Sequence, residues 1–245
     1  MYLSLVVPAW NGADRLAATL AALSSFLAEQ PYASELVVVD DASGPATRAA
    51  LDGAARRLPA LTVIHNARNR GKGYSVSRGM LAARGRYRVF TDADLAYPAA
   101  EVATILRQLE GGSDVAVACR VLPESRYVMS PTFFPYLFTR HVMSRAFNAV
   151  VRATLLPGVL DTQAGLKGFT ADAGALIFPR LTIGGFGFDV EALYVARRHR
   201  LRVAQTAVSF RYDAEPSTVR FAQHGARMLA DVWKIRWNGL RRRYD

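Results

Sequence analysis

Two aspartates, Asp92 and Asp94, follow an apolar run at residues 89–90 and precede a segment whose apolar residues recur at helical spacing. This order predicts a strand, a loop and a helix, with both carboxylates at the end of the strand where open α/β sheets bind ligands. Neighbouring carboxylates repel each other unless a cation lies between them. Because a hard divalent cation binds one or two carboxylates together with diphosphate oxygens, the pair is a candidate site for such a cation. Helix capping by one of the aspartates is the alternative.

A second pair of acids, Asp40 and Asp41, ends another apolar run. An acid at the end of an early strand commonly hydrogen-bonds the ribose or base of a nucleotide. The order Asp-Asp-Ala-Ser is equally typical of a turn that leads into a helix. Between the two acidic strand ends lies the glycine-rich segment 69–74, in which backbone amides can approach an anion and Lys72 adds a positive charge. These features indicate contact with a phosphate or a base.

Elements that could position these residues alternate along the first half of the chain. Short apolar runs predict strands at 3–8, 35–41, 61–65, 87–92 and 114–119, with helices between them. This alternation indicates an α/β fold with a parallel, doubly wound sheet. After residue 120 the spacing predicts helices at 136–153, 172–178 and 190–199, one or two strands within 203–212, and a basic amphipathic helix at about 219–241. The segment 156–169 is expected to be a loop.

The composition favours an anionic partner. The chain of 245 residues has 31 basic and 20 acidic residues, a formal charge of +11, which suits a nucleotide diphosphate, a phospholipid surface or a nucleic acid. The single cysteine, Cys119, excludes an internal disulfide and fits a reducing compartment. The first residues are predicted to form a strand and not a signal peptide, and no apolar run reaches the length of a membrane span. The four histidines are scattered without the spacing of metal ligands, so a zinc site built from histidines is not expected.

Five motifs occur in a characteristic order: LVVPAWN at 5–11, VVDDAS at 38–43, NRGKG at 69–73, DADL at 92–95 and DTQAGLKGF at 161–169. Together they resemble the family 2 inverting glycosyltransferases of GT-A fold. The chain is most similar to the branch of dolichyl- or polyprenyl-phosphate glucosyltransferases and mannosyltransferases, and its last motif looks more like the glucosyl-type enzymes that use a UDP-sugar. The resemblance covers the chain to about residue 212.

The resemblance implies a GT-A fold, a Rossmann-like and mostly parallel central sheet flanked by helices, with a helical region on the acceptor side. It implies one domain over residues 1–245. Within that domain we expect a nucleotide-sugar-binding half at 1–119, an acceptor-binding half at 120–212, and a basic amphipathic helix at 213–245.

The resemblance also implies roles for donor-side residues. Pro8, Ala9 and Asp40 would hold the nucleoside, Lys72 would lie near the base or diphosphate, and Asp92 with Asp94 would carry Mg²⁺ or Mn²⁺ that bridges the diphosphate. Two positions depart from the family pattern. Gly12 stands where relatives usually have an acid, for which Asp14 could substitute only in a reshaped turn. Ala96 stands where some relatives have a glutamine.

On the acceptor side the resemblance assigns Arg120, Arg140 and Ser144 to the lipid phosphate, which suits the forked guanidinium group of arginine. The spacing of Arg140, Ser144, Asn148 and Arg152 alone gives a slowly rotating polar stripe on one helix. Such a stripe is equally well explained as a solvated helix face.

The general base has two candidates, Asp189 and Asp161. Asp189 lies where many family members have a carboxylate, and transfer to a hydroxyl needs a group that takes its proton. Asp189 can equally be a cap of the helix that begins at residue 190. Because a phosphate acceptor is already ionised near neutral pH, a strong base is not required for it.

The basic C-terminal helix, with its apolar residues interleaved among arginines, can lie on an anionic membrane. Packing of the apolar face onto its own domain explains the pattern equally well.

These inferences combine into a predicted function, a metal-dependent inverting hexosyltransferase that moves glucose from UDP-glucose to a polyprenyl or dolichyl phosphate. We expect a cytoplasmic protein, peripheral at the inner face of the membrane, whose partners are a UDP-sugar, a lipid phosphate and the anionic membrane surface. The first alternative is a family 2 glycosyltransferase with a hydroxyl acceptor on a glycan or small molecule. A basic nucleic-acid-binding protein is more remote because the arginines are dispersed and no nucleic-acid module is recognised. A nucleotidyltransferase is disfavoured because its glycine-rich phosphate loop is missing.

Overall fold

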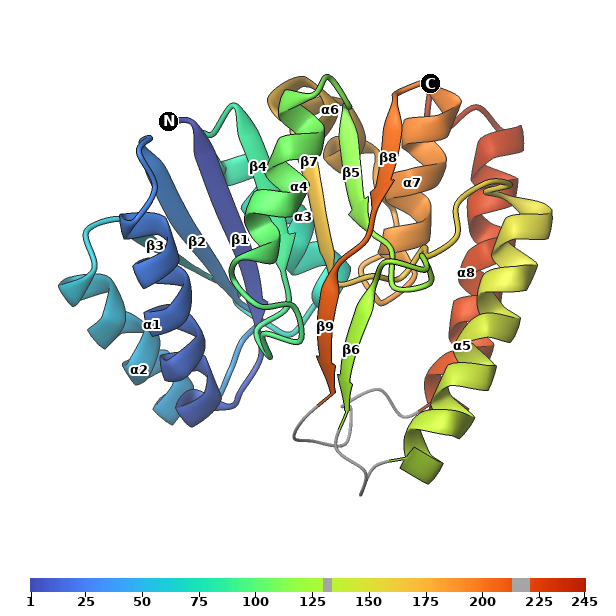
Figure 1. Cartoon of the computed structure of the whole chain (residues 1–245). Coiled ribbons are helices and arrows are strands. Elements are labelled where there is room, and N and C mark those ends of the chain that lie inside the picture. The colour runs from blue at the N-terminus through green and yellow to red at the C-terminus, as the bar shows by residue number, and fades with distance from the viewer. Residues whose placement is uncertain (130–133, 213–220) are drawn as a thin grey trace.

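The structure of the chain, a computed structural model, describes residues 1–129, 134–212 and 221–245, except for the side chains of 129, 134–143, 212 and 221–226. A seven-stranded sheet with the order β3-β2-β1-β4-β7-β5-β8 forms its centre (Figure 1). Its strands are β1 (Leu3–Ala9), β2 (Ser34–Asp40), β3 (Leu61–His65), β4 (Tyr87–Thr91), β5 (Val115–Ala118), β7 (Leu166–Thr170) and β8 (Val203–Thr206). All neighbouring pairs are parallel except those of β7 with β4 and β5. The mostly parallel sheet expected from the sequence is therefore confirmed.

The strands of the first half are apolar because both faces of the sheet are covered. Val89 and Phe90 of β4 point to opposite faces, and both are buried. The same is true of Val6 and Val7 in β1. A nearly continuous apolar run is what a parallel strand needs when helices pack on both of its faces.

Four helices connect the first five strands: α1 (Ala13–Ala28), α2 (Pro45–Arg57), α3 (Lys72–Ala82) and α4 (Glu101–Glu110). In Figure 1, α1 and α4 lie in front of the sheet and α3 lies behind it. Helix α4 buries Val102, Ile105, Leu106 and Leu109, which recur at helical spacing along one face. The alternation of strand and helix predicted for this half is confirmed.

Strand β7 (Leu166–Thr170) corrects the prediction of a loop at 156–169. It lies antiparallel between β4 and β5, and Phe90 is paired with Lys167. A lysine and a glycine inside a strand of five residues remove the apolar run that marks the other strands. The strand is stable there because the Lys167 ammonium finds partners at the end of the sheet, as described below.

The second half adds a two-stranded parallel ribbon of β6 (Arg126–Met129) and β9 (Ser209–Tyr212). Its helices are α5 (Phe134–Thr154), α6 (Ala171–Ile177), α7 (Phe188–Arg198) and α8 (Phe221–Leu240), with the short 3-10 helix η2 (Phe178–Arg180). Each predicted helix of this half is present, although residues 219–220 of the last one lie outside the described residues. Figure 1 shows α5 and α8 alongside each other at one side of the molecule, where they pack together. None of the helices in the described part of the chain is long and apolar enough to span a bilayer.

Candidate active site

The carboxyl ends of β1, β2 and β4 meet at one edge of the sheet, because these strands are parallel neighbours. Ala9 is in register with Asp40, and Asp92 follows the end of β4 directly. The two acidic strand ends predicted from the sequence therefore share one edge, separated by a single strand. This is the place where open α/β sheets bind ligands.

The loop between β3 and α3 is tied to the second strand by Asp41. The Asp41 carboxylate accepts hydrogen bonds from the backbone N–H groups of Arg70 and Gly71, at 2.9 and 2.7 Å. Gly71 adopts a φ of +92°, and a Cβ there would lie 2.5 Å from the Gly184 carbonyl oxygen, so only glycine fits. This arrangement fixes the backbone immediately before Lys72.

Lys72 reaches from this loop to the next acidic strand end, where its Nζ lies 2.6 Å from Oδ1 of Asp92. Burial alone would lower the pKa of Lys72, but the carboxylates of Asp92 and Asp189 outweigh it and raise the pKa. The ammonium group of Lys72 therefore stays charged between the carboxylates of Asp92 and Asp189.

Asp92 and Asp94 are the residues that could hold a divalent metal. Burial raises the pKa of Asp94, and the negative charge of Asp92 raises it further, so the two carboxylates repel each other. A cation between them would relieve that repulsion. Among the residues that the structure describes, no group of three or more His, Cys, Asp or Glu side chains forms a metal cage. A pair of carboxylates fits Mg²⁺ or Mn²⁺ if the diphosphate and water supply the other oxygens.

Gly165, in the loop before β7, lies directly against Asp92. A Cβ at this position would be 2.0 Å from Oδ2 of Asp92, and the Gly165 carbonyl accepts a hydrogen bond from the Asp92 N–H at 3.2 Å. The motif at 161–169 therefore needs a glycine here, because any side chain would displace the carboxylate.

Lys167 and Asp189 form a buried ion pair beside this loop. The Lys167 Nζ lies 2.6 Å from Oδ1 of Asp189 and donates to the Ala164 carbonyl at 2.6 Å. The lysine has no exposed surface, and it lies over the Phe90 ring. Burial lowers the pKa of Lys167 and raises that of Asp189, so each group depends on the other to stay charged. The carboxylate that the sequence marked as a base is thus held by a lysine.

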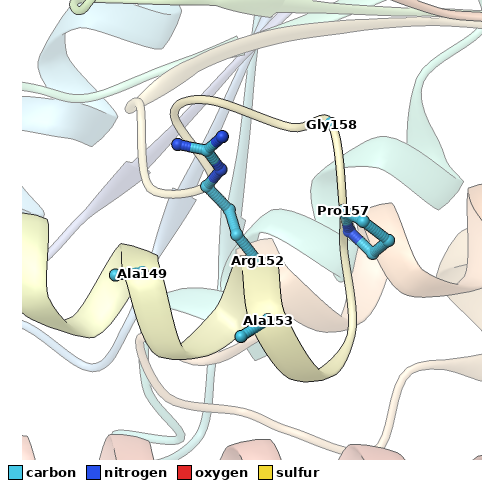
Figure 2. Close-up of a pocket in the computed structure, with 5 residues that line it drawn as sticks. All are labelled: Ala149, Arg152, Ala153, Pro157 and Gly158. Atoms are coloured by element: carbon cyan, nitrogen blue, oxygen red, sulfur yellow. The ribbon is translucent and has the colours of Figure 1, made fainter.

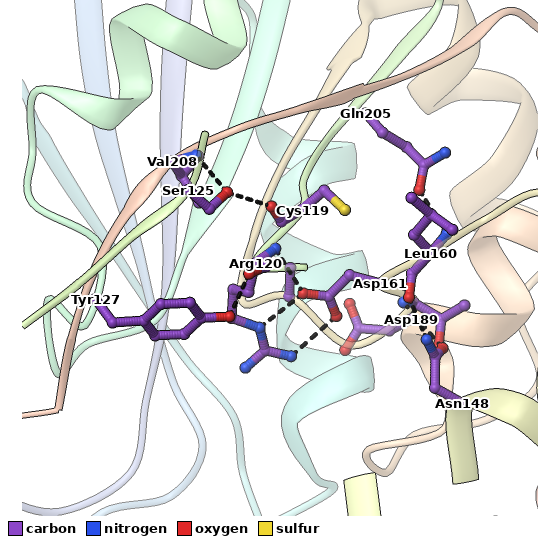
Figure 3. Close-up of polar contacts among 12 residues, drawn as sticks. Cys119, Arg120, Ser125, Tyr127, Asn148, Leu160, Asp161, Asp189, Gln205 and Val208 are labelled. Carbon is purple, nitrogen blue, oxygen red and sulfur yellow. Dashed lines mark hydrogen bonds and ion pairs between the residues drawn. The ribbon is translucent and has the colours of Figure 1, made fainter. Parts of the chain in front are cut away.

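Arg120 and Asp161 form a second pair further along the edge (Figure 3). The Arg120 Nε and Nη2 bind the two carboxylate oxygens at 2.7 and 2.9 Å, and the Arg120 backbone N–H donates to Oδ2 at 3.1 Å. Burial opposes ionisation of Asp161, but Arg120 outweighs it and lowers the pKa of the carboxyl below its usual range. Both residues were predicted for the site, but in different roles, and the structure binds them to each other.

The residues of the polar stripe predicted on α5 differ in their contacts and in their burial. The Asn148 side chain donates to the Leu160 carbonyl and accepts from the Thr162 hydroxyl at 2.8 Å, so it positions the loop that carries Asp161. Ser144 is half-buried, whereas Arg152 is exposed. Arg140 belongs to α5, but its side chain lies outside the described residues.

The three residues predicted to hold the nucleoside lie at the ends of the first two strands. Pro8 and Ala9 end β1, and Asp40 is fully buried at the end of β2. The Asp40 carboxylate accepts from the Ser43 N–H at 2.9 Å and lies 2.8 Å from Nδ1 of His65. The proposed roles of these three residues stay predictions.

Sequence reasoning missed the contributions of Lys167, Asp41, Asn148 and Gly165. The rarity of lysine is the one signal that could have pointed to the first of them, since Lys167 is one of three lysines in the chain. The others act through contacts with segments distant in sequence, which no local pattern reveals.

The fold and the site therefore define a class of protein with a mostly parallel α/β sheet and an acidic, lysine-containing carboxyl edge. Residues 4–154 match the model of the family described as Glycosyl transferase family 2. This match covers more than half of the chain, and the chain belongs to that family, as its motifs indicated.

Two similar proteins are named dolichyl-phosphate beta-glucosyltransferase. The one from Dictyostelium discoideum is 30% identical over 96% of this chain and 77% of its own length. The one from Drosophila melanogaster is 34% identical over 84% of this chain and 66% of its own length. The expected similarity to this branch is therefore confirmed.

Solved structures of the same fold include glucosyl-3-phosphoglycerate synthase from Mycobacterium tuberculosis in complex with UDP. It is 20% identical, with a TM-score of 0.69 over 96% of this chain and 79% of that chain. A second structure of that enzyme, with Mn²⁺, UDP and glucosyl-3-phosphoglycerate, has a TM-score of 0.69 at 19% identity. These likenesses confirm the expected α/β fold.

Proposed function

We propose that this chain transfers glucose from UDP-glucose to a polyprenyl phosphate and inverts the configuration at the sugar carbon. The main support is a row of charges along the sheet edge. In order, its members are Asp94, Asp92, Lys72, Asp189, Lys167, Asp161 and Arg120. The first end of the row suits a diphosphate with its cation, and the last end suits a phosphate monoester. The names of the two similar glucosyltransferases support the same sugar and acceptor.

Donor binding is assigned to the first half of the chain. Pro8, Ala9 and Asp40 hold the nucleoside, while Lys72 lies where its charge meets the diphosphate. Asp92 and Asp94 hold Mg²⁺ or Mn²⁺, and the bound ion would neutralise the charge that develops on the departing UDP. The solved relative with Mn²⁺ and UDP agrees with this assignment.

Acceptor binding is assigned to Arg120, Arg140 and Ser144. The bond of Arg120 to Asp161 fixes the plane of its guanidinium group, so a phosphate would meet a positioned donor set. An acceptor phosphate oxygen attacks C1 of glucose, the bond between C1 and the UDP oxygen breaks, and UDP leaves. A single in-line displacement of this kind gives a β-linked product from an α-linked donor.

The state of the two base candidates favours a phosphate acceptor over a hydroxyl. Oδ1 of Asp189 binds Lys167, and both carboxylate oxygens of Asp161 bind Arg120. Ion-paired carboxylates suit the positioning of cations better than the removal of a proton. A phosphate acceptor, which is ionised near neutral pH, needs no proton removed.

In this proposal residues 1–245 act as one glycosyltransferase domain that works at a membrane. The halves 1–119 and 120–212 bind donor and acceptor, and the described part of the basic C-terminal segment, residues 221–245, faces the membrane. Because a polyprenyl phosphate stays in the bilayer, the enzyme is peripheral at its cytoplasmic face. The anionic lipids there complement the charge of +11.

Transfer assays with labelled donors test this function. The purified chain is incubated with Mn²⁺, UDP-glucose and a short-chain polyprenyl phosphate, and the polyprenol of the same length serves as the matched acceptor without phosphate. We expect label in the organic phase only with the phosphate, with a β-linked product. Transfer to the polyprenol or to free glycans, with none to the phosphate, would replace the proposal by the hydroxyl-acceptor alternative. A preference for GDP-mannose would overturn the assigned donor.

A further inference from the structure

Helix α8 carries a second apolar face that no other described part of the chain covers. Leu229, Trp233, Trp237 and Leu240 are 44, 71, 55 and 69% exposed. Their spacing places them within an arc of about 80° on the helix, and we name these four residues the tryptophan stripe. The residues that pack α8 onto the protein, Met228, Val232 and Ile235, are buried and lie on a different face.

The helix periodicity places basic residues on both sides of the tryptophan stripe. Arg236 lies on one side, and Arg227, Lys234 and Arg241 lie on the other. The Arg241 guanidinium lies 4.5 Å from the centre of the Trp237 ring. A helix with exposed tryptophan and leucine between arginines and lysines is typical of the interface between water and a lipid headgroup layer.

The acidic residues of α8 and of the segment after it contact other parts of the protein and not the stripe. Asp231 is half-buried, and its carboxylate lies against Gly187 at the start of α7. Asp245 forms an ion pair with Arg198 at 2.5 Å. The described surroundings of the stripe are therefore positive, which complements a negatively charged surface.

Helix α5 extends the same basic surface. The Arg236 Nη1 donates to the Thr154 carbonyl at the end of α5, at 3.2 Å. Two residues before Thr154, Arg152 points over a hollow of about 340 Å³ that Ala149, Ala153, Pro157 and Gly158 complete (Figure 2). On the same helix, Val150 is 41% exposed.

We propose that the tryptophan stripe inserts into the headgroup layer of an anionic phospholipid membrane and holds α8 flat on its surface. The inference deepens the proposed function and rests on it for its purpose, since the acceptor lies in the bilayer. A second copy of the chain is a poorer partner, because a symmetric contact through this face would bring the flanking arginines and lysines together.

Vesicle sedimentation tests the stripe with matched variants. The full chain is mixed with vesicles of phosphatidylglycerol and phosphatidylcholine, or of phosphatidylcholine alone. We expect Trp233→Ser/Trp237→Ser to lower partitioning onto the anionic vesicles about tenfold or more, because two large apolar side chains are lost. Leu81→Ser, at a 48% exposed leucine on α3, is the control and should bind like the wild type. Arg227→Gln/Arg241→Gln should lower binding about fivefold per arginine on anionic vesicles only.

A second measurement keeps the inference testable if the double serine variant folds poorly. With brominated lipids in the anionic vesicles, Trp233 and Trp237 of a Trp10→Phe chain should be strongly quenched. Absence of quenching, or wild-type binding by the serine variant, would overturn the inference. So would a stable dimer of the wild type that the serine variant dissociates.

The assay also separates this inference from the proposed function. Transfer to a water-soluble, short-chain polyprenyl phosphate does not require a membrane, so the serine variant should retain it. If the wild type shows no such transfer but binds vesicles as expected, the docking inference stands and the proposed function fails. If transfer occurs but the serine variant binds vesicles like the wild type, the proposed function stands and the docking inference fails.

Discussion

The two ends of the site, to which we assign the donor and the acceptor, are built differently. At the donor end, Asp41, Lys72 and Asp92 come from successive strand ends and loops of the first half. At the acceptor end, Arg120 meets Asp161 across 41 residues of sequence, and Asn148 of α5 holds the loop that carries Asp161. Local motifs therefore mark the donor end, whereas long-range packing assembles the acceptor end.

The two ends also differ in charge. At the donor end, Asp92 pairs with Lys72, whereas burial and the charge of Asp92 raise the pKa of Asp94 against the opposing charges of Lys72 and Arg15. The acceptor end is balanced, since Arg120 pairs with Asp161 and Lys167 pairs with Asp189. A cation should therefore act at the donor end, while substitutions at the acceptor end should alter acceptor binding and stability.

Substitution of Asp94 should break the donor end most severely. Asp94→Asn keeps the shape of the side chain but removes one of the two charges, and we expect kcat/KM for UDP-glucose to fall about 10³-fold. Steady-state kinetics with Mn²⁺ measure the effect. Asp52→Asn, at an exposed carboxylate 3.0 Å from His65, is the matched control and should stay near wild type. A loss in Asp94→Asn no larger than in the control would contradict the metal assignment.

Gly165→Ala tests the contact through which the second half of the chain shapes the donor end. The added methyl group would occupy the place of Oδ2 of Asp92, so the carboxylate must move. A displacement of about 1 Å can lower the rate about a hundredfold, and we expect that loss in kcat. Gly185→Ala is the control, because nothing lies within 4 Å of a Cβ there. Equal activity of the two variants would show that the position of Asp92 does not matter.

Arg120→Gln should separate the acceptor end from the donor end. Loss of a charged hydrogen-bonding group should raise KM for the lipid phosphate about 10- to 100-fold, while the affinity for UDP stays close to wild type. The variant leaves Asp161 buried without its cation, and unfolding should become easier by about 3 kcal/mol. Arg120→Gln/Asp161→Asn removes both charges, so it should recover stability but not acceptor affinity. Recovery of both would mean that Arg120 has only a structural role.

Acid denaturation should show a smaller effect from the same pair. The pKa of Asp161 is lowered in the folded state, so its contribution to stability is present above the unfolded pKa of about 3.9. As the pH falls through the folded pKa, that contribution is lost. Denaturant unfolding of the wild type and Asp161→Asn should therefore differ most near neutral pH and converge in acid. A difference that is independent of pH would contradict the ion pair.

The contrast between local motifs and long-range packing also explains which strands could be predicted from the sequence. The strands that carry Asp40 and Asp92 are apolar runs, because both faces of a parallel sheet are buried, and their order could be predicted. Strand β7 could not, since Lys167 and Gly168 interrupt its apolar pattern and its burial depends on Asp189 from another element.

The site shows the same limit. Asp161 was recognised by its place in a motif and Arg120 by its position at a strand end, but their ion pair depends on the fold of the whole second half. The antiparallel insertion of β7 brings the loop before it against Asp92. Sequence patterns thus identify the chemical groups, and tertiary packing decides which of them touch.

Calorimetric titration with UDP tests most directly whether a cation between Asp92 and Asp94 holds the donor diphosphate. Titrations of the wild type and Asp92→Asn/Asp94→Asn are run with Mn²⁺ and with a chelator. We predict that Mn²⁺ tightens UDP binding to the wild type about tenfold or more and leaves the double variant unchanged. Equal affinity of the wild type for UDP in the two conditions would contradict the account.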